Sequence, residues 1–268
     1  NPSFFTTMIL YWGGVLLRRI LNNIQNPLAV IILAAGKGTR MNSDMPKVLH
    51  PIGTLPMITR VVKTAIALHA KPIIPVLGYK HELVQFALKN EPVECVLQLE
   101  QLGTAHAVLQ CRPILKNFNG NILILYGDVP LTKVGTLQRL LKIHNSKEVE
   151  STILTADLPD PTGYGRIIRN SDESLNKIVE ETDATDEEHK IHEINSGIYV
   201  FRSHTLFNLL PMVENNNSQN EYYLPDVLNL LLEKKEKIAI DKIKNYFEIQ
   251  GINNPKQLNE INAFIEKD

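Results

Sequence analysis

The sequence predicts an α/β protein with a mostly parallel, doubly wound sheet. Apolar runs of strand length alternate with amphipathic segments of helical length, the connections are short, and the alternation continues from residue 28 to residue 156. Such alternation is typical of parallel strands that helices cover on both faces. Ligands of these sheets bind at the carboxyl ends of the strands, so the residues that follow each strand are the first candidates for a site.

The first predicted strand covers residues 28–33, where an apolar run stops at small residues and glycines. Further strands are predicted where short runs are apolar, at 72–77, 93–98, 122–126, 151–156 and 194–201, with two shorter ones at 238–240 and 246–249. Helices are predicted where apolar residues recur at helical spacing, at 57–69, 80–89, 104–111, 134–145, 206–210, 224–235 and 255–267.

The pattern changes after residue 157. Residues 163–169 and 175–179 predict a hairpin or a meander, and residues 182–192 predict a polar, acidic loop. We therefore expect a small antiparallel lobe at roughly 158–202, laid over the ligand crevice of the main sheet. Residues 28–268 form one domain in this interpretation.

Composition excludes several classes of protein. The chain has 268 residues with 44% apolar content, which is enough to bury a full core. Its formal net charge is −1 and its pI is about 6.8, so no global basic field favours a nucleic-acid partner. Cys95 and Cys111 are too few for a disulfide framework. We expect both thiols to be reduced, which suits a cytoplasmic location.

Residues 1–27 lie outside the alternating pattern and are predicted to form a leader. Residues 1–17 carry no charge, and Arg18 and Arg19 follow. A secretory signal places its positive charge before the apolar run, and the Gly13-Gly14 pair argues against a membrane helix. Three interpretations stay open: an appended amphipathic helix or disordered leader, a non-native start, and, least favoured, membrane attachment.

A glycine-rich loop follows the first strand. Gly36 and Gly38 let the backbone come close to an anion, and Lys37, Arg40 and Lys47 supply positive charge for more than one phosphate group. The loop is not a Walker loop, because Thr39-Arg40 follows the last glycine. It is not the dinucleotide fingerprint either, because Met41 stands where that pattern needs a third glycine. The loop predicts a nucleoside triphosphate as ligand.

Two other segments reach the same edge of the predicted sheet. Asp128 follows the strand at 122–126, and a carboxylate there suits Mg²⁺, which prefers oxygen ligands together with phosphate oxygens. Gln98 precedes Gly103-Thr104 and offers both a donor and an acceptor, as the edge of a pyrimidine requires. His106 lies inside the next helix and is expected to pack or to cap rather than to catalyse.

These segments resemble a known family. Gly36 to Arg40, followed by Pro46-Lys47, resembles the signature of the sugar-phosphate nucleotidyltransferases. From about Leu28 to Asn262 the chain is similar to the uridylyltransferase domain of the bacterial bifunctional N-acetylglucosamine-1-phosphate enzymes, more than to guanylyl- or thymidylyl-transferring relatives. The segments that carry this similarity, in the order of that domain, are Ser43 to His50, Gln98 to Ala107, Ile122 to Leu131, Gly163 to Ile167, Ile178 to Glu181, Ile194 to Ile198 and Gly251 to Asn254.

The resemblance implies a fold similar to that of glycosyltransferase-A enzymes and transfer of a uridylyl group from UTP to N-acetylglucosamine 1-phosphate, with Mg²⁺ as cofactor. It implies that Arg40 and Lys47 are catalytic, holding the triphosphate and the charge that develops on it. The other implied contacts are Leu33, Ala34, Gly36, Lys47, Gln98, Gly103 and Thr104 to the nucleotide, Tyr126, Gly165, Glu180 and Asn195 to the sugar, and Asp128 and Asn253 to the metal. The product would be a peptidoglycan precursor used in cell wall biogenesis.

Two alternatives stay open. The chain could be a UTP-dependent transferase for another hexose 1-phosphate, or a homologue that binds nucleotide sugars without turnover. A binding homologue is expected to lack a phosphate cation or a metal ligand, whereas both cations and both expected metal ligands are present.

The chain also departs from the family. The bifunctional enzymes continue into a β-helix that transfers an acetyl group, but no hexapeptide repeat is present before Asp268. We therefore expect no acetyltransferase domain in this chain, and a homo-oligomer stays open. Glu193 and the acidic stretch at 183–188 bear on the sugar pocket, so the choice of acceptor sugar is the expectation with the least support.

Overall fold

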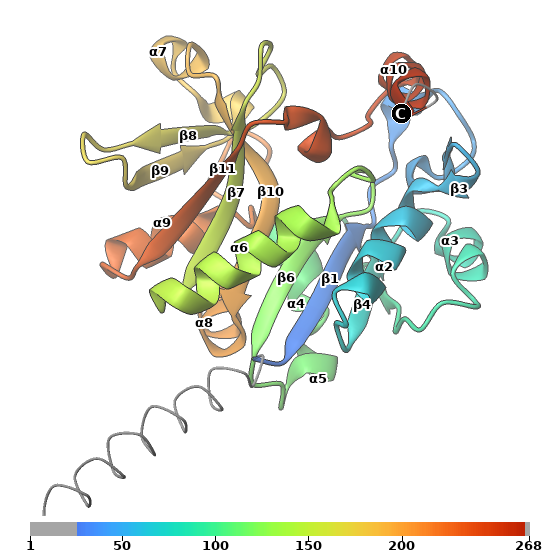
Figure 1. The fold of residues 1–268 in the computed structure, drawn as a ribbon, viewed down its shortest axis with the longest axis horizontal. Helices are drawn as coiled ribbons and strands as arrows, with labels where there is room; N and C mark the ends of the chain where they lie inside the picture. Colours follow the sequence, from blue (N-terminus) through green and yellow to red (C-terminus); the bar gives the residue numbers. More distant parts are fainter. Residues whose placement is uncertain (1–25, 266–268) are drawn as a thin grey trace, which may run out of the picture.

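A computed structural model of the chain describes residues 26–265 and shows a twisted sheet between two layers of helices (Figure 1). The strands follow the order β11-β7-β10-β6-β1-β4-β5. Their bounds are β1 Leu28–Ala34, β4 Ile73–Leu77, β5 Val96–Leu97, β6 Asn121–Tyr126, β7 Ser151–Asp157, β10 Glu193–Arg202 and β11 Ile238–Ile243. Neighbours in this path are parallel, except that β10 runs antiparallel to both β6 and β7. The prediction of a mostly parallel, doubly wound sheet is confirmed.

Helices cover both faces of the sheet because strand residues alternate between them. Ala29 and Ile31 of β1 belong to one apolar cluster, and Val30 and Ile32 belong to the other. The first cluster packs against α4, α8 and α9, and the second against α2, α3 and α6. The helices are α2 Met57–Ala67, α3 His81–Ala87, α4 Thr104–Leu109, α5 Arg112–Leu115, α6 Val134–Lys147, α7 Asp186–His189, α8 Ser203–Leu209, α9 Asp226–Glu233 and α10 Pro255–Ile265.

A hairpin of β8 (Arg166–Arg169) and β9 (Leu175–Val179) extends the sheet beside β10. Because β10 is reversed, its first residues lie at the edge where β1, β6 and β7 end, with Asn195 opposite Thr155. The main-chain N–H of Asn195 donates to the carbonyl of Gly165 at 2.8 Å, just before β8. The hairpin therefore adjoins the carboxyl ends of the parallel strands, where Figure 1 shows it beside α7.

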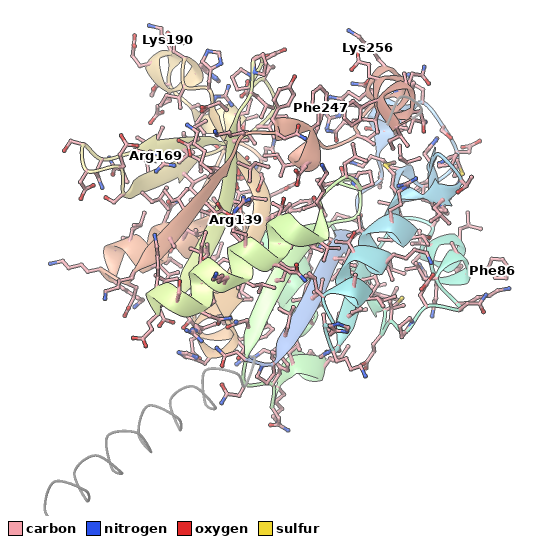
Figure 2. All side chains as sticks on the ribbon, viewed as in Figure 1. Phe86, Arg139, Arg169, Lys190, Phe247 and Lys256 are labelled. Carbon is pink, nitrogen blue, oxygen red and sulfur yellow. The ribbon has the colours of Figure 1, made fainter. Side chains whose placement is uncertain are left out.

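Most predicted elements are present, with three corrections. The strand predicted at 93–98 is reduced to β5, which has two residues. The strand predicted at 246–249 is wrong: these residues form a 3₁₀ helix, η5 (Tyr246–Ile249), in which the Asn245 side chain caps the N–H of Phe247. Phe247 also stacks on Phe264 of α10, with ring centroids 5.2 Å apart, and Figure 2 shows it between the sheet and that helix.

The third correction concerns residues 182–192, which are not a continuous loop. They include the end of the 3₁₀ helix η3 (Glu181–Asp183) and all of α7. Thr185 caps α7 and Glu188 completes a capping box with it. Such a box stabilises even a single helical turn, because two main-chain donors gain partners.

The predicted leader falls almost entirely on residues 1–25, which lie outside the described residues. Within residues 26–265, no helix combines the length and the apolar character that a membrane span requires.

Glu193 was expected to bear on the sugar pocket, but its side chain belongs to an ionic cluster instead. Its carboxylate accepts from Nε of Arg169 at 2.7 Å and from the Thr155 hydroxyl at 2.6 Å, and Lys242 Nζ lies 3.5 Å away. Figure 2 places Arg169 on the β8–β9 hairpin. Burial alone would raise the pKa of Glu193, but hydrogen bonds from Arg169 and Thr155 and the nearby positive charges lower it. The cluster therefore ties the hairpin to the main sheet.

The Glu193→Gln substitution is expected to lower the free energy of unfolding by about 2–3 kcal/mol at pH 7, because Arg169 keeps its charge and loses its partner. The folded-state pKa of Glu193 lies below its ordinary value. Its contribution is therefore full above that ordinary value and is lost as the pH falls through the lowered pKa. Urea unfolding of both proteins at pH 7 and pH 3 measures this.

Glu173→Gln is the matched control, since Glu173 is exposed and its carboxylate lies 4.0 Å from the same Arg169. This control should change stability by less than about 0.5 kcal/mol. An equal effect of both substitutions would contradict a stabilising role for the buried cluster.

Candidate active site

The glycine loop leaves β1 and folds back over a lysine. Gly38 has φ +62°, and a Cβ at this position would lie 2.5 Å from the Cβ of Lys47. Any other side chain at Gly38 would therefore displace the stem of Lys47 as well as strain the backbone. Gly36 has no atom within 4 Å of the place where its Cβ would be, so the loop presents bare backbone on its other side. A loop of this shape leaves room for a ligand beside its N–H groups.

Two cationic side chains and two side-chain oxygens that accept hydrogen bonds from them converge next to this loop. Lys47 Nζ donates to Asp128 Oδ2 and, at 3.1 Å, to Asn253 Oδ1. Arg40 Nη2 donates to the same Asn253 oxygen at 3.2 Å. Lys47 begins a 3₁₀ turn (η2, Lys47–Leu49), Asp128 follows β6, and Asn253 precedes α10. The fold thus brings together three segments that the sequence keeps far apart.

A cavity of about 360 Å³ opens beside this group. Its lining includes all the residues that the sequence analysis expected to contact a nucleotide, namely Leu33, Ala34, Gly36, Lys47, Gln98, Gly103 and Thr104. Gln98 is buried, and its Nε2 donates to the Gly103 carbonyl at 3.0 Å. His106 Nδ1 lies 3.0 Å from the same amide, so this histidine is packed as expected.

A second cavity, of about 270 Å³, shares Asp128 and Asn253 with the first. Its lining includes the four residues that were expected to contact a sugar: Tyr126, Gly165, Glu180 and Asn195. The residues lining both cavities are Thr104, Tyr126, Asp128, Glu221 and Asn253. The two hollows therefore meet at the cluster of charged groups.

The smaller cavity has unusual electrostatics. Burial, followed by the charges of Asp226 and Asp183, raises the pKa of Glu180 to about 7, although a hydrogen bond with Asn195 opposes the shift. Asn195 is itself fixed, because its Oδ1 accepts from the Tyr199 hydroxyl at 2.8 Å and from the Gly197 N–H at 3.0 Å. Glu180 therefore changes its charge near neutral pH.

A short ladder joins the walls of the two cavities. The Tyr222 N–H donates to the Leu102 carbonyl at 2.8 Å, and the Tyr222 carbonyl accepts from the Ala105 N–H at 2.9 Å. The Leu224 N–H donates to the Thr104 hydroxyl at 2.9 Å. Gly103 has φ +111°, and a Cβ there would lie 2.5 Å from the Tyr222 carbonyl oxygen. Glycine is thus required for the close approach of these two segments.

The sequence analysis missed several lining residues. Glu221 lines both cavities, Tyr164 and Tyr223 line the smaller one, and Gln101 lines the larger one. Glu221 and Tyr223 lie between a polar loop and the start of α9, where no motif marked them. Tyr164 lies between Gly163 and Gly165, and this position next to an expected sugar contact was the one signal in the sequence that could have identified it.

The oxygen pair suits a hard divalent cation. Asp128 Oδ2 and Asn253 Oδ1 already share one cation, the Lys47 ammonium. A carboxylate and an amide oxygen are the ligand types that Mg²⁺ prefers, with phosphate oxygens and waters completing the shell. Among residues 26–265, no group of three or more His, Cys, Asp and Glu side chains could hold a metal by itself. The donor set therefore fits Mg²⁺ that is bound together with a phosphate.

Curated proteins are similar to this chain in sequence. The bifunctional protein GlmU of Trichodesmium erythraeum (strain IMS101) is 43% identical over 249 residues, which cover 89% of this chain and 52% of that protein. GlmU of Streptococcus uberis (strain ATCC BAA-854 / 0140J) is 47% identical over 223 residues, which cover 83% of this chain and 48% of that protein. The chain thus spans about half the length of these curated relatives.

Solved structures agree on the fold. UDP-glucose pyrophosphorylase complexed with UDP-glucose superposes with a TM-score of 0.71 at 18% identity, covering 90% of this chain and 100% of that one. A putative glucose-1-phosphate thymidylyltransferase from Bacillus anthracis superposes with a TM-score of 0.70 at 18% identity, covering 90% and 96%. The model of the nucleotidyl transferase family matches residues 29–267. The alternation of strands and helices, the paired cavities and this match lead to one conclusion: the chain belongs to the nucleotidyl transferase family.

Proposed function

We propose that this protein transfers a uridylyl group from UTP to N-acetylglucosamine 1-phosphate, giving UDP-N-acetylglucosamine and pyrophosphate. The observation that carries the proposal is the meeting of the two cavities at Asp128 and Asn253, to which Lys47 donates hydrogen bonds. Two anionic substrates that occupy the two cavities would have their phosphates at one cluster of charge. The similarity of the chain to bifunctional GlmU proteins supports the same reaction.

The larger cavity suits the nucleotide. Leu33, Ala34 and Gly36 present backbone and small side chains beside the phosphate loop. Nε2 of Gln98 is engaged by the Gly103 carbonyl, which leaves Oε1 to accept the imide N–H of uracil. Cytosine has an unprotonated nitrogen at that position and cannot donate. Gly103 and Thr104 complete the wall next to the base.

The smaller cavity suits the acceptor sugar. Glu180 and Asn195 carry the acceptors and donors that sugar hydroxyls and an acetamido group need, with Tyr126 and Gly165 beside them. The lobe at 158–202 then provides much of the acceptor site. The two cysteines are free thiols, and these together with water-soluble substrates support a cytoplasmic location.

The chemistry is an in-line displacement. A phosphate oxygen of the sugar phosphate forms a bond to the α-phosphorus of UTP. The bond from that phosphorus to the bridging oxygen breaks, and pyrophosphate leaves with the electron pair. Lys47 and Arg40 stabilise the negative charge on the α-phosphate and the leaving group, since both already lie at this junction. No nucleophile from the protein is required, so positioning and electrostatics carry the catalysis.

Asp128 and Asn253 would hold Mg²⁺ at the junction. The ion supplies charge neutralisation between two phosphate groups that otherwise repel each other. Lys47 shares these two oxygens, so it lies within reach of the same phosphates.

The reaction itself is tested by pyrophosphate release. With UTP, Mg²⁺ and N-acetylglucosamine 1-phosphate we expect turnover, and slower release with CTP, glucose 1-phosphate or galactosamine 1-phosphate. A coupled phosphate assay with pyrophosphatase measures each pair of substrates. A faster rate with another hexose 1-phosphate would replace the proposed acceptor, and no release with any pair would reject the transferase.

Asp128→Asn is expected to lower kcat by on the order of 10²–10³, because the site loses the anionic ligand of the metal. The change keeps the shape of the side chain, so circular dichroism should be unchanged. The matched control is Asp44→Asn, which removes an exposed carboxylate from the loop between Arg40 and Lys47. If the two variants had equal kcat, the role given to Asp128 would be wrong.

Glu180 makes acceptor binding depend on pH. Its pKa of about 7 means that the carboxylate dominates above pH 7 and the neutral acid below. Because the carboxylate is the better acceptor for sugar hydroxyls, the KM for N-acetylglucosamine 1-phosphate should rise as the pH falls from 8 to 6. In Glu180→Gln this dependence should vanish. Dividing the KM of the wild type by that of Glu180→Gln at each pH cancels the effect of substrate titration, which is the same for both proteins. If this ratio did not change with pH, the role given to Glu180 would be wrong.

A further inference from the structure

Tyr164 contacts the expected metal-binding loop from the sugar side. It lies in the turn before β8, where its N–H donates to the Pro161 carbonyl at 3.2 Å. Its ring lines the sugar-side cavity, and its hydroxyl accepts from the main-chain N–H of Gly251 at 3.2 Å. Burial raises the pKa of this hydroxyl, so it stays neutral. One side chain thus joins the turn before β8 to the segment that carries Asn253.

The main chain of the loop at 251–253 is held by three hydrogen bonds, in addition to those that the Asn253 side chain accepts from Lys47 and Arg40. The Ile252 N–H donates to the main-chain carbonyl of Asp128 at 3.0 Å, and the Asn253 N–H donates to Gln257 Oε1 at 2.8 Å. The third is donated by the Gly251 N–H, for which Tyr164 is the acceptor. Gly251 is buried, so loss of the acceptor would leave its N–H without a protein partner.

The other end of Tyr164 is anchored to the acidic side of the sugar cavity. Its main-chain carbonyl accepts from Nη1 of Arg166, which is 1% exposed. The same Nη1 lies 2.7 Å from Glu181 Oε2, one residue after Glu180. The main-chain carbonyl of Tyr164 is therefore bound by Arg166 near the sugar-side cavity, and its hydroxyl binds the loop that carries Asn253.

We propose that Tyr164 is a positioning residue that fixes Asn253 for metal binding and couples its placement to the sugar-side cavity. This inference rests on the proposed function, but it is tested by metal binding, which can be measured without turnover. Groups that orient a metal ligand typically change metal affinity when they are removed, because the ligand then samples other positions.

The test is Tyr164→Phe, which removes one oxygen and keeps the ring. Binding of Mn²⁺ in the presence of UTP, with no sugar phosphate added, is followed by the electron paramagnetic resonance signal of free Mn²⁺. We expect the Mn²⁺ dissociation constant to rise about tenfold, at the low end of what outer partners of metal ligands contribute. Tyr246→Phe is the matched control, because Tyr246 lies in η5 just before the same loop and outside both cavities. It should bind Mn²⁺ as the wild type does.

A double-mutant cycle asks whether Tyr164 acts through Asn253. In an Asn253→Ala background, Tyr164→Phe should change kcat/KM by less than about twofold, because the ligand that it positions is gone. Independent, additive losses would overturn the proposal, as would unchanged Mn²⁺ binding in Tyr164→Phe. Absence of Mn²⁺ binding in the wild type would overturn it too. If the wild type binds Mn²⁺ with UTP but gives no product, the proposed function fails and the Mn²⁺ titrations decide this inference alone.

Discussion

The convergence of Lys47, Arg40, Asp128 and Asn253 is the constraint on which the rest of the site depends. Lys47 and Asp128 are mostly removed from water and must be paired, and Asn253, from a distant part of the chain, accepts from both Lys47 and the exposed Arg40. The pairing needs β1 and β6 side by side, so that the glycine loop and Asp128 leave the sheet at the same edge. It also needs the segment before α10 to return to that edge, which the bond from Ile252 to Asp128 secures. Fold and charge are thus specified together.

The sequence was sufficient for the architecture and, to within one residue, for the carboxyl ends of β1, β4 and β6. Parallel strands that are buried on both faces are nearly continuous apolar runs, so their carboxyl ends can be located without a structure. This is why the glycine loop, Gln98 and Asp128 were found from the residues alone. The prediction of a strand at 246–249 rested on a short apolar stretch alone and was wrong. Capping by Asn245 and stacking of Phe247 on Phe264 stabilise a 3₁₀ helix there.

Residues whose position depends on tertiary packing could not be found in this way. Glu221 and Tyr223 reach the cavities because the neighbouring backbone pairs with residues 102–105, an interaction between segments more than a hundred residues apart. The same limit applies to Glu193. Its place two residues before Asn195 suggested the sugar pocket, but Thr155 of β7 and Arg169 of β8, both distant in the sequence, bind its carboxylate.

The reversed direction of β10 has a consequence for how such a protein can diversify. The contacts proposed for the base and triphosphate come mainly from residues 33–104, whereas those proposed for the acceptor come from residues 126–195, chiefly from the hairpin and the amino end of β10. Changes in the β8–β9 hairpin or in α7 can therefore remodel one substrate's recognition while the phosphate-handling edge stays intact. In a fold divided in this way, mutations in one lobe can change the acceptor while the residues that carry out the transfer stay the same.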